Sequence, residues 1–374
     1  MHVSSFYPRL EENNIDVTIN TGGGDSDFDQ EDSAESVAET VDEVQDTTEL
    51  DQTADDAEES AEDAKDASDA AEMLLHSLSE FYTYRRIAKT HGVDRTFLAI
   101  ANSNDSLSEL INVKLPGCES FDAIGNPRSA MSQQVVAGLE GAIQTAWEWI
   151  KNLFQKIWYA IRDFIANIVN FFTDVDKRIS KLKEALGKLP ADAKPADDRK
   201  IKGLTLQVFK DVGNKITSAS GKAIGSDGKD PELPDLSEKR TEIELSKISR
   251  SDISQYITSL EGFSASIKTT KKMAEEMMKT AKKGVDNAKK NASNGGSEEE
   301  VKKAKEEAAN TKKDMSAFTK CAKAMTSLLK EGLHVPTAWI RWASRNSSGK
   351  NESEKKTVAS SNTNQPTYLL TNAK

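Results

Sequence analysis

Lysine pairs are the residues of this chain whose type and spacing point most directly to a chemistry. Between Lys268 and Lys330 the sequence holds 16 lysines against nine acidic residues. A lysine ammonium is a point charge that favours diffuse phosphate contact over bidentate base readout. The favoured interpretation is a solvated helix face balanced by i,i+4 partners such as Glu275 and Lys279, and the alternative is non-specific nucleic-acid contact once the acidic arm is gone. The candidate residues are Lys271, Lys272, Lys282, Lys283, Lys289, Lys290, Lys302, Lys303, Lys312 and Lys313.

Residue types that perform catalysis or bind metals form no recognisable pattern. The four histidines are far apart in the sequence and follow no metal-ligand spacing. The sequence contains no P-loop, no G-x-S-x-G motif and no Rossmann glycine string. Cys118 has no histidine nearby, and with Cys321 it forms neither a C-x-x-C pair nor a disulfide framework. We therefore expect no enzymatic activity, no cofactor and no metal site.

Charge is divided unevenly along the chain. Residues 1–72 hold 24 acidic residues and only two basic ones, a net charge of −22, so the formal total of −11 leaves +11 on residues 73–374. Large apolar residues are also scarce after Ile19, and such a segment cannot bury enough surface to offset its ordering entropy. We predict a disordered acidic arm over residues 1–65. Joined to a basic body, it would act as an electrostatic mask whose removal changes what the body binds.

The longest apolar pattern predicts the element that must organise the fold. From Ile143 to Leu189 apolar residues recur every three or four positions, and the stripe is widest over 147–172. So wide a face must be covered, and a helical bundle is the favoured interpretation. A helix lying in a membrane interface and an oligomerising coiled coil are the alternatives. The packing or membrane face comprises Trp147, Ile150, Phe154, Ile157, Trp158, Ile161, Phe164 and Ile168.

Proline, glycine and capping residues set the remaining boundaries. Gly92 ends one predicted helix, Asp94 caps the next, and a Pro/Gly loop covers 114–127. No run predicts a strand, no 18-residue apolar window predicts a membrane span, and the N-terminus lacks secretory-signal features. The expected fold is all-α: an elongated helical bundle with long amphipathic helices and a C-terminal helical hairpin, preceded by the acidic arm. The predicted segments are the arm (1–65), a short helical remainder (66–119), the long helix (120–190), a linker with a short basic helix (191–235), a Lys-rich hairpin turning at 291–296 (236–343) and a disordered polar tail (344–374).

Two short motifs carry a resemblance to a known family. Residues 115–121 read Leu-Pro-Gly-Cys-Glu-Ser-Phe, and residues 147–154 read Trp-Glu-Trp-Ile-Lys-Asn-Leu-Phe. Together they resemble internal head proteins of large tailed bacteriophages, which are also described as prohead core or virion structural proteins. The resemblance covers about residues 70–190. It implies an acidic N-terminal propeptide followed by an amphipathic helix.

The resemblance also implies cleavage by a prohead protease after a glutamate that has a small or aliphatic residue two positions before it. Gly117-Cys118-Glu119 fits the small form, and Leu78-Ser79-Glu80 fits the aliphatic form. A protease needs exposed, extended backbone, which favours the Pro/Gly loop over a predicted helix. We expect the cut between Glu119 and Ser120, with Glu80 and Phe81 as the alternative. A cut at Glu119 would separate a segment of charge −22 from one of +11.

The favoured hypothesis is a non-enzymatic phage head-interior protein, synthesised in the host cytoplasm and processed in the prohead. Its expected partners are other prohead core and capsid proteins, the prohead protease, and DNA contacted non-specifically once the arm is removed. A membrane-active protein that inserts the 147–172 face is one alternative. A cytoplasmic coiled-coil adaptor, which would keep its arm, is the other.

Overall fold

The computed structural model describes residues 34–102, 126–196, 199–223, 231–265 and 268–361, all within one compact unit. The fold is all-α, as predicted, and two short strands are its only sheet within these ranges. Short 3-10 turns cover Ser237–Lys239 and Leu245–Lys247. The elements in chain order are α1 (Ala34–Gln45), α2 (Thr48–Thr90), α3 (Arg95–Asn102), α5 (Ala130–Lys188), β1 (Lys200–Gly203), α6 (Leu206–Ala223), β2 (Thr241–Glu244), α7 (Arg250–Ala265), α8 (Lys268–Asn294) and α9 (Glu298–Ser361).

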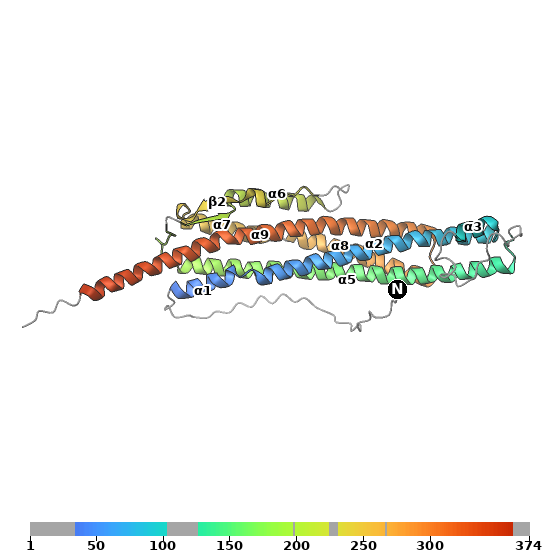
Figure 1. Ribbon diagram of the computed structural model, residues 1–374, viewed down its shortest axis with the longest axis horizontal. Coiled ribbons are helices and arrows are strands. Elements are labelled where there is room, and N and C mark those ends of the chain that lie inside the picture. Colours follow the sequence, from blue (N-terminus) through green and yellow to red (C-terminus); the bar gives the residue numbers. More distant parts are fainter. Residues whose placement is uncertain (1–33, 103–125, 197–198, 224–230, 266–267, 362–374) are drawn as a thin grey trace, which may run out of the picture. The chain divides into compact units, whose positions relative to one another are not determined.

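Helix α5 is the element against which the other long helices pack. It spans 59 residues and begins at a serine cap, where the Ser129 side chain accepts a hydrogen bond from the Ser132 amide. Helices α2, α8 and α9 all lie along it, and α2 and α9 also contact each other (Figure 1). Across this core, the Phe164 ring of α5 meets the Phe318 ring of α9 edge-on, with centroids 5.1 Å apart.

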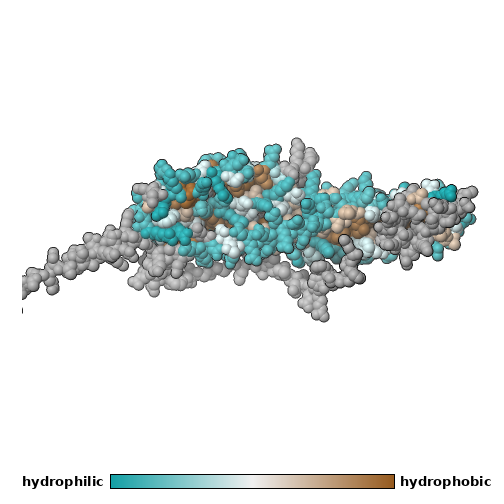
Figure 2. Space-filling model, viewed as in Figure 1, coloured by the Kyte–Doolittle hydropathy of each residue, from teal (hydrophilic) through white to brown (hydrophobic). Residues whose placement is uncertain are grey.

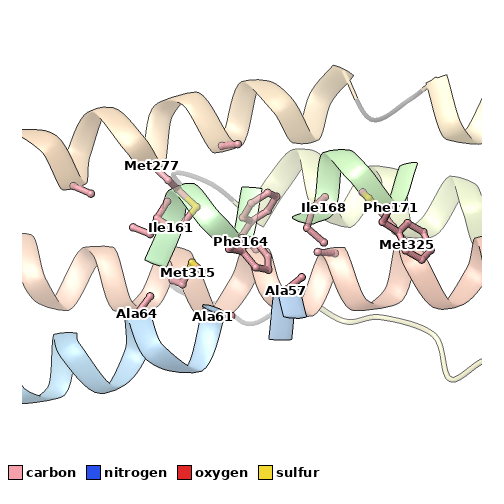
Figure 3. Packing of buried hydrophobic residues seen from close by; sticks show 14 of the residues in the cluster. Ala57, Ala61, Ala64, Ile161, Phe164, Ile168, Phe171, Met277, Met315 and Met325 are labelled. Atoms are coloured by element: carbon pink, nitrogen blue, oxygen red, sulfur yellow. The ribbon is translucent and has the colours of Figure 1, made fainter. Parts of the chain in front are cut away.

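The apolar face predicted on the long helix lies inside this bundle. Seven of its eight residues are buried, and Trp158 is partly buried against the same core. Figure 3 shows Ile161, Phe164 and Ile168 of α5 between side chains of the neighbouring helices. A helix lying in a membrane interface would need this face free, whereas α2, α8 and α9 cover it. None of the described helices is long and apolar enough to cross a membrane.

The junction after α2 follows the sequence signals. Helix α2 ends at Thr90, and Gly92 adopts a positive φ of 80°. The Asp94 side chain then accepts a hydrogen bond of 2.7 Å from the Phe97 amide, as an N-cap should. The Val93 amide donates to Ser132 Oγ at 2.9 Å, which ties this turn to the start of α5.

The prediction of a disordered arm over 1–65 is wrong for residues 34–65. These residues form α1 and the first part of α2, while residues 1–33 lie outside the described part of the chain. The prediction relied on the scarcity of large apolar residues. It did not weigh alanine, which has the highest helix propensity and can pack a helix closely against its neighbours.

The predicted polar tail from 344 is wrong for residues 344–361, because α9 continues through Pro336 to Ser361. Tertiary contacts support the extension. Trp339 is buried and its Nε1 donates to the carbonyl of Ile248 at 3.0 Å, and Asn346 Nδ2 donates to the carbonyl of Lys194 at 2.8 Å.

The expectation of no strands is also wrong. Strands β1 and β2 pair antiparallel, with Ile201 opposite Ile243. Each strand has four residues, and only Gly203 and Ile243 are buried in them. So short a run, with charged residues on both sides of each isoleucine, carries too little alternation to predict a strand.

The first arm of the predicted hairpin is not one continuous helix, whereas its turn connects two long helices, α8 and α9. Residues 236–265 form two 3-10 turns, β2 and α7, so only α8 is a long helix in that arm. The turn to α9 uses Gly295 and Gly296, both at positive φ. Tyr82 Oη of α2 donates to the Gly295 carbonyl at 2.5 Å, and Trp147 Nε1 of α5 donates to Tyr82 Oη at 3.1 Å. The hairpin tip is thereby attached to α2 and α5, and burial raises the pKa of Tyr82.

The two turn glycines give a matched pair of substitutions. A Cβ at Gly296 would lie 2.5 Å from Trp147 Nε1 and 3.0 Å from Tyr82 Oη, whereas one at Gly295 meets nothing within 4 Å. Gly295→Ala should cost only the left-handed backbone penalty, about 1–2 kcal/mol. Gly296→Ala should cost more, because the Tyr82–Trp147 contact must also move. Urea unfolding of both variants measures the difference, and equal costs would contradict the attachment.

Candidate functional site: the acidic helix and its basic partners

One face of α2 packs against the neighbouring helices mainly through small residues. These residues recur at alternating steps of four and three positions, the spacing that keeps one face of a helix in contact with its neighbours. Figure 3 shows Ala57, Ala61 and Ala64 on the side of α2 that faces α5 and α9. We call this set the alanine seam, and it comprises Leu50, Ala54, Ala57, Ala61, Ala64, Ser68, Ala71, Leu75 and Leu78.

A pocket of about 100 Å³ lies beside the first half of the alanine seam, between α2, α5 and α9, and is partly open to solvent. Ala54, Ala57, Phe164 and Ile168 line it together with the charged side chains of Glu58 and Lys323. The second half of α2 has larger buried side chains, including Phe81 and Tyr82. The acidic half of α2 therefore buries smaller side chains than its C-terminal half does.

Acidic residues of α2 pair with lysines of α9 in a regular register. The step of seven from Asp51 to Glu58 matches the step from Lys330 back to Lys323, and the step of eleven from Glu58 to Asp69 matches the step from Lys323 back to Lys312. Two antiparallel helices in fixed register produce this match. The three pairs, which we call the ion-pair ladder, are Asp51 with Lys330 (2.5 Å), Glu58 with Lys323 (2.8 Å) and Asp69 with Lys312.

The ion-pair ladder specifies register more than it adds stability. Its hydrogen bonds lower the pKa of Asp51 and raise the pKa of Lys312. However, the Lys323 and Glu58 side chains are 63% and 56% exposed. Exposed pairs contribute at most about 1 kcal/mol each because water and salt screen them. The seam must therefore provide most of the docking energy, and the ladder selects which surface α2 covers.

A buried arginine of α5 holds the break between α1 and α2. Arg178 Nη1 donates to the carbonyl oxygens of Glu43 at 3.2 Å, Val44 at 2.8 Å and Asp46 at 2.5 Å. Only 10% of the Arg178 side chain is exposed. The carbonyls at a helix C-terminus lack intrahelical partners and carry partial negative charge, so the guanidinium caps α1. It fixes the first acidic helix onto the body.

Further ion pairs attach both ends of the acidic segment. Lys181 of α5 pairs with Glu43, and Arg341 of α9 pairs with Asp42 at 2.6 Å. At the other end of α2, Lys89 and Arg85 both bond Glu140 of α5, and the hydrogen bond from Lys89 is the main cause of its lowered pKa. The acidic segment is thus part of the folded body.

A comparison with known protein families matches residues 25–230 to the phiKZ-like phage internal head proteins. That range is more than half of the chain. The chain belongs to this family. The predicted resemblance to phage internal head proteins is confirmed, and the protein is a structural component of the phage head interior. No curated protein and no solved structure matches.

The family match covers both acidic helices and the long helix that supports them. The matched range contains α1, α2 and α5, and it ends before α8 and α9. The ion-pair ladder therefore joins α2, which lies within the matched range, to α9, which lies outside it.

The structure does not bring the predicted lysine pairs onto one masked surface. Lys312 pairs with the acidic helix, whereas Lys303 pairs with Glu299 on its own helix. Lys271 and Lys272 lie in α8, but their side chains are outside the described part of the structure. The other candidates, all exposed, are Lys282, Lys283, Lys289, Lys290, Lys302 and Lys313.

Sequence reasoning missed the residues that do meet the acidic segment. Lys323 and Lys330 are single lysines, so a search for lysine pairs passed over them. Arg178 looks like one more polar position on an amphipathic helix. The signal that was available is the matched spacing of seven between Asp51 and Glu58 and between Lys323 and Lys330.

Only one of the two candidate cleavage sites lies within the described residues. Glu119 and Ser120 lie outside the described residues. Glu80 lies within α2, and Phe81 is only 3% exposed. A cut at Glu80 would require α2 to unwind where Phe81 and Tyr82 are buried, which argues against that alternative.

The cap on α1 can be tested with neighbouring basic residues. Arg178→Ala leaves buried carbonyl groups without a donor, and a group of this kind costs about 1–3 kcal/mol. Lys177→Ala is the control, since Lys177 is 68% exposed and pairs only within α5; it should change stability by about 0.5 kcal/mol or less. Hydrogen exchange of residues 34–47 should rise in the first variant alone. Unchanged protection in Arg178→Ala would contradict the capping role.

The alanine seam can be tested with one charge placed at two positions. Ala64 is 1% exposed and Ala70 is exposed on the same helix. Ala64→Glu would bury an unpaired carboxylate, at a cost of about 3–5 kcal/mol, and should expose the 48–72 segment to limited proteolysis. Ala70→Glu adds the same charge on the solvent side and should leave digestion unchanged. Equal digestion of both variants would refute docking through the seam.

Proposed function

We propose that this internal head protein is a prohead core component whose acidic helices α1 and α2 mask a basic, apolar groove until the prohead protease cuts the chain. The observation that carries the proposal is the ion-pair ladder, because it joins the acidic segment to lysines of the body in one register. A mask must contact the surface that it covers, and this segment does.

We place the cut between Glu119 and Ser120. These residues belong to the sequence between α3 and α5, where proline and glycine on both sides disfavour a helix. A cut there would detach residues 1–119 from the body without breaking a described helix. Cleavage at Glu80 would instead divide α2.

Cleavage alone would not remove the mask. Helix α2 packs along α5 and α9, so the cut segment would stay bound until it dissociates. What changes is that dissociation becomes possible: the tethered segment rebinds at high effective concentration, whereas a free segment can be diluted or displaced. We expect release to begin at the acidic half of α2, because its buried side chains are smaller than those of the C-terminal half.

Release would change the charge of the remaining protein. Residues 120–374 carry 43 basic and 32 acidic residues, a net charge of +11. Lys312, Lys323 and Lys330 would lose their carboxylate partners and become available to a polyanion. In a head that fills with DNA, these residues would make non-specific phosphate contacts, while other core and capsid proteins compete for the uncovered groove.

The test is the N-terminus of the protein in the mature virion, read by intact mass and N-terminal sequencing. We expect a chain that begins at Ser120. Glu119→Gln should leave the chain uncut, because the protease is expected to require glutamate there. The control Glu80→Gln should be processed normally. A full-length chain in virions, or one beginning at Phe81, would overturn the proposed site.

A further inference from the structure

Helix α8 carries lysines that no acidic residue neutralises. Within the described part of the chain Lys279, Lys282, Lys283, Lys289 and Lys290 form no ion pair, and all five are exposed. The α9 lysines of the ion-pair ladder differ, because each has a carboxylate partner from α2. We call these five residues the α8 lysine stripe.

The stripe occupies one side of the helix. Steps of three, four and seven residues keep the lysines on the face opposite Ala281, Ala288 and Ala292, which are buried. At a rise of about 1.5 Å per residue, the stripe extends over about 17 Å. One acidic residue, Asp286, lies among the lysines. Residues 279–290 thus hold five lysines and one acidic residue, a net charge of +4 on this stretch of α8.

The acidic helix does not cover this surface. Helices α2 and α8 each pack against both α5 and α9, and they share no extended contact within the described residues. Charges at opposite sides of a bundle interact weakly, because the screening length is about 8 Å at physiological ionic strength. The net charge of −11 on the whole chain therefore does not cancel the local field of the stripe.

The composition of the stripe fits nucleic acid better than protein. Protein interfaces are depleted in lysine and depend on apolar anchors at their centre. No large exposed apolar residue of the described chain lies in α8; the four that are exposed are Met73, Trp149, Tyr159 and Val169. On the face that Figure 2 presents, hydrophilic residues predominate and apolar residues form a few patches. Hydrated ammonium groups without apolar neighbours suit a phosphate backbone.

We propose that the α8 lysine stripe binds the phosphate backbone of double-stranded DNA in the uncut chain, independently of the acidic helix. The protein then has two cationic surfaces: one on α8 that is always open, and one on α9 that the acidic helix covers. This inference rests on the proposed function only in taking the α9 surface to be covered before cleavage. The stripe itself needs no processing to act.

The experiment measures binding of the purified uncut chain to a fluorescent 30-base-pair duplex across a salt series. Five phosphate contacts would give a slope of log K against log salt of about −4.5. Lys282→Gln with Lys289→Gln should weaken binding and flatten the slope by about 1.8. Asp286→Asn should tighten binding. The control with the same change of charge is Lys210→Gln with Lys215→Gln, at two exposed lysines of α6, and it should leave the affinity of the uncut chain unchanged.

Three results would overturn the inference. The first is that the uncut chain does not bind the duplex, and the second is that the α8 variants bind as tightly as the original chain. The third is that the α6 control weakens binding as much as the α8 variant does. Sedimentation of the same samples tests the competing occupant, an acidic segment of a second copy. Self-association that the α8 substitutions abolish, without DNA binding, would assign the stripe to that contact instead. Because no cleavage enters these measurements, their failure is distinct from failure of the proposed processing.

Discussion

The apolar face of α5 is the constraint on which the rest of the structure depends. Its buried residues run from Val135 to Leu186, and no single helix can cover a stripe that is both so long and so wide. Helices α2, α8 and α9 each cover part of it, and α1 and α7 cover its C-terminal end. The positions of the acidic helix and of the lysine-rich helix are therefore set by one requirement, the removal of the α5 face from water.

That requirement explains which features could be predicted from the sequence. Large apolar residues at helical spacing identify α5 directly, and Gly92 and Asp94 mark a junction through local chemistry alone. Helix α1 and the part of α2 before residue 66 were not predicted, because this part of α2 buries mostly alanine, which adds little to an apolar periodicity. Helix α9 beyond Ser344 and the strands β1 and β2 were missed for a related reason, since they depend on contacts between distant parts of the chain, such as Asn346 with Lys194 and Ile201 with Ile243. Charge partners such as Arg178 depend on register, which only the folded chain defines.

Folding and masking use the same element in this protein. A flexible acidic arm could be removed without structural consequence, but α2 buries the α5 face as well as pairing with the α9 lysines. Any step that removes α2 must leave apolar surface that another helix, another copy or a rearranged body then covers. Maturation by loss of this segment would accordingly change both the charge of the protein and its packing.

The use of alanine rather than leucine in the alanine seam follows from this double role of α2 in folding and masking. A buried leucine removes several more methylene-sized groups from water than alanine does, at about 0.8 kcal/mol for each CH₂. A leucine seam from Ala54 to Ala71 would hold the acidic helix far more tightly and fill the pocket beside Ala57. The alanine seam instead supplies helix propensity and close approach with modest burial, and the ion-pair ladder supplies the register that alanine cannot. Together they describe a segment that docks specifically and remains separable.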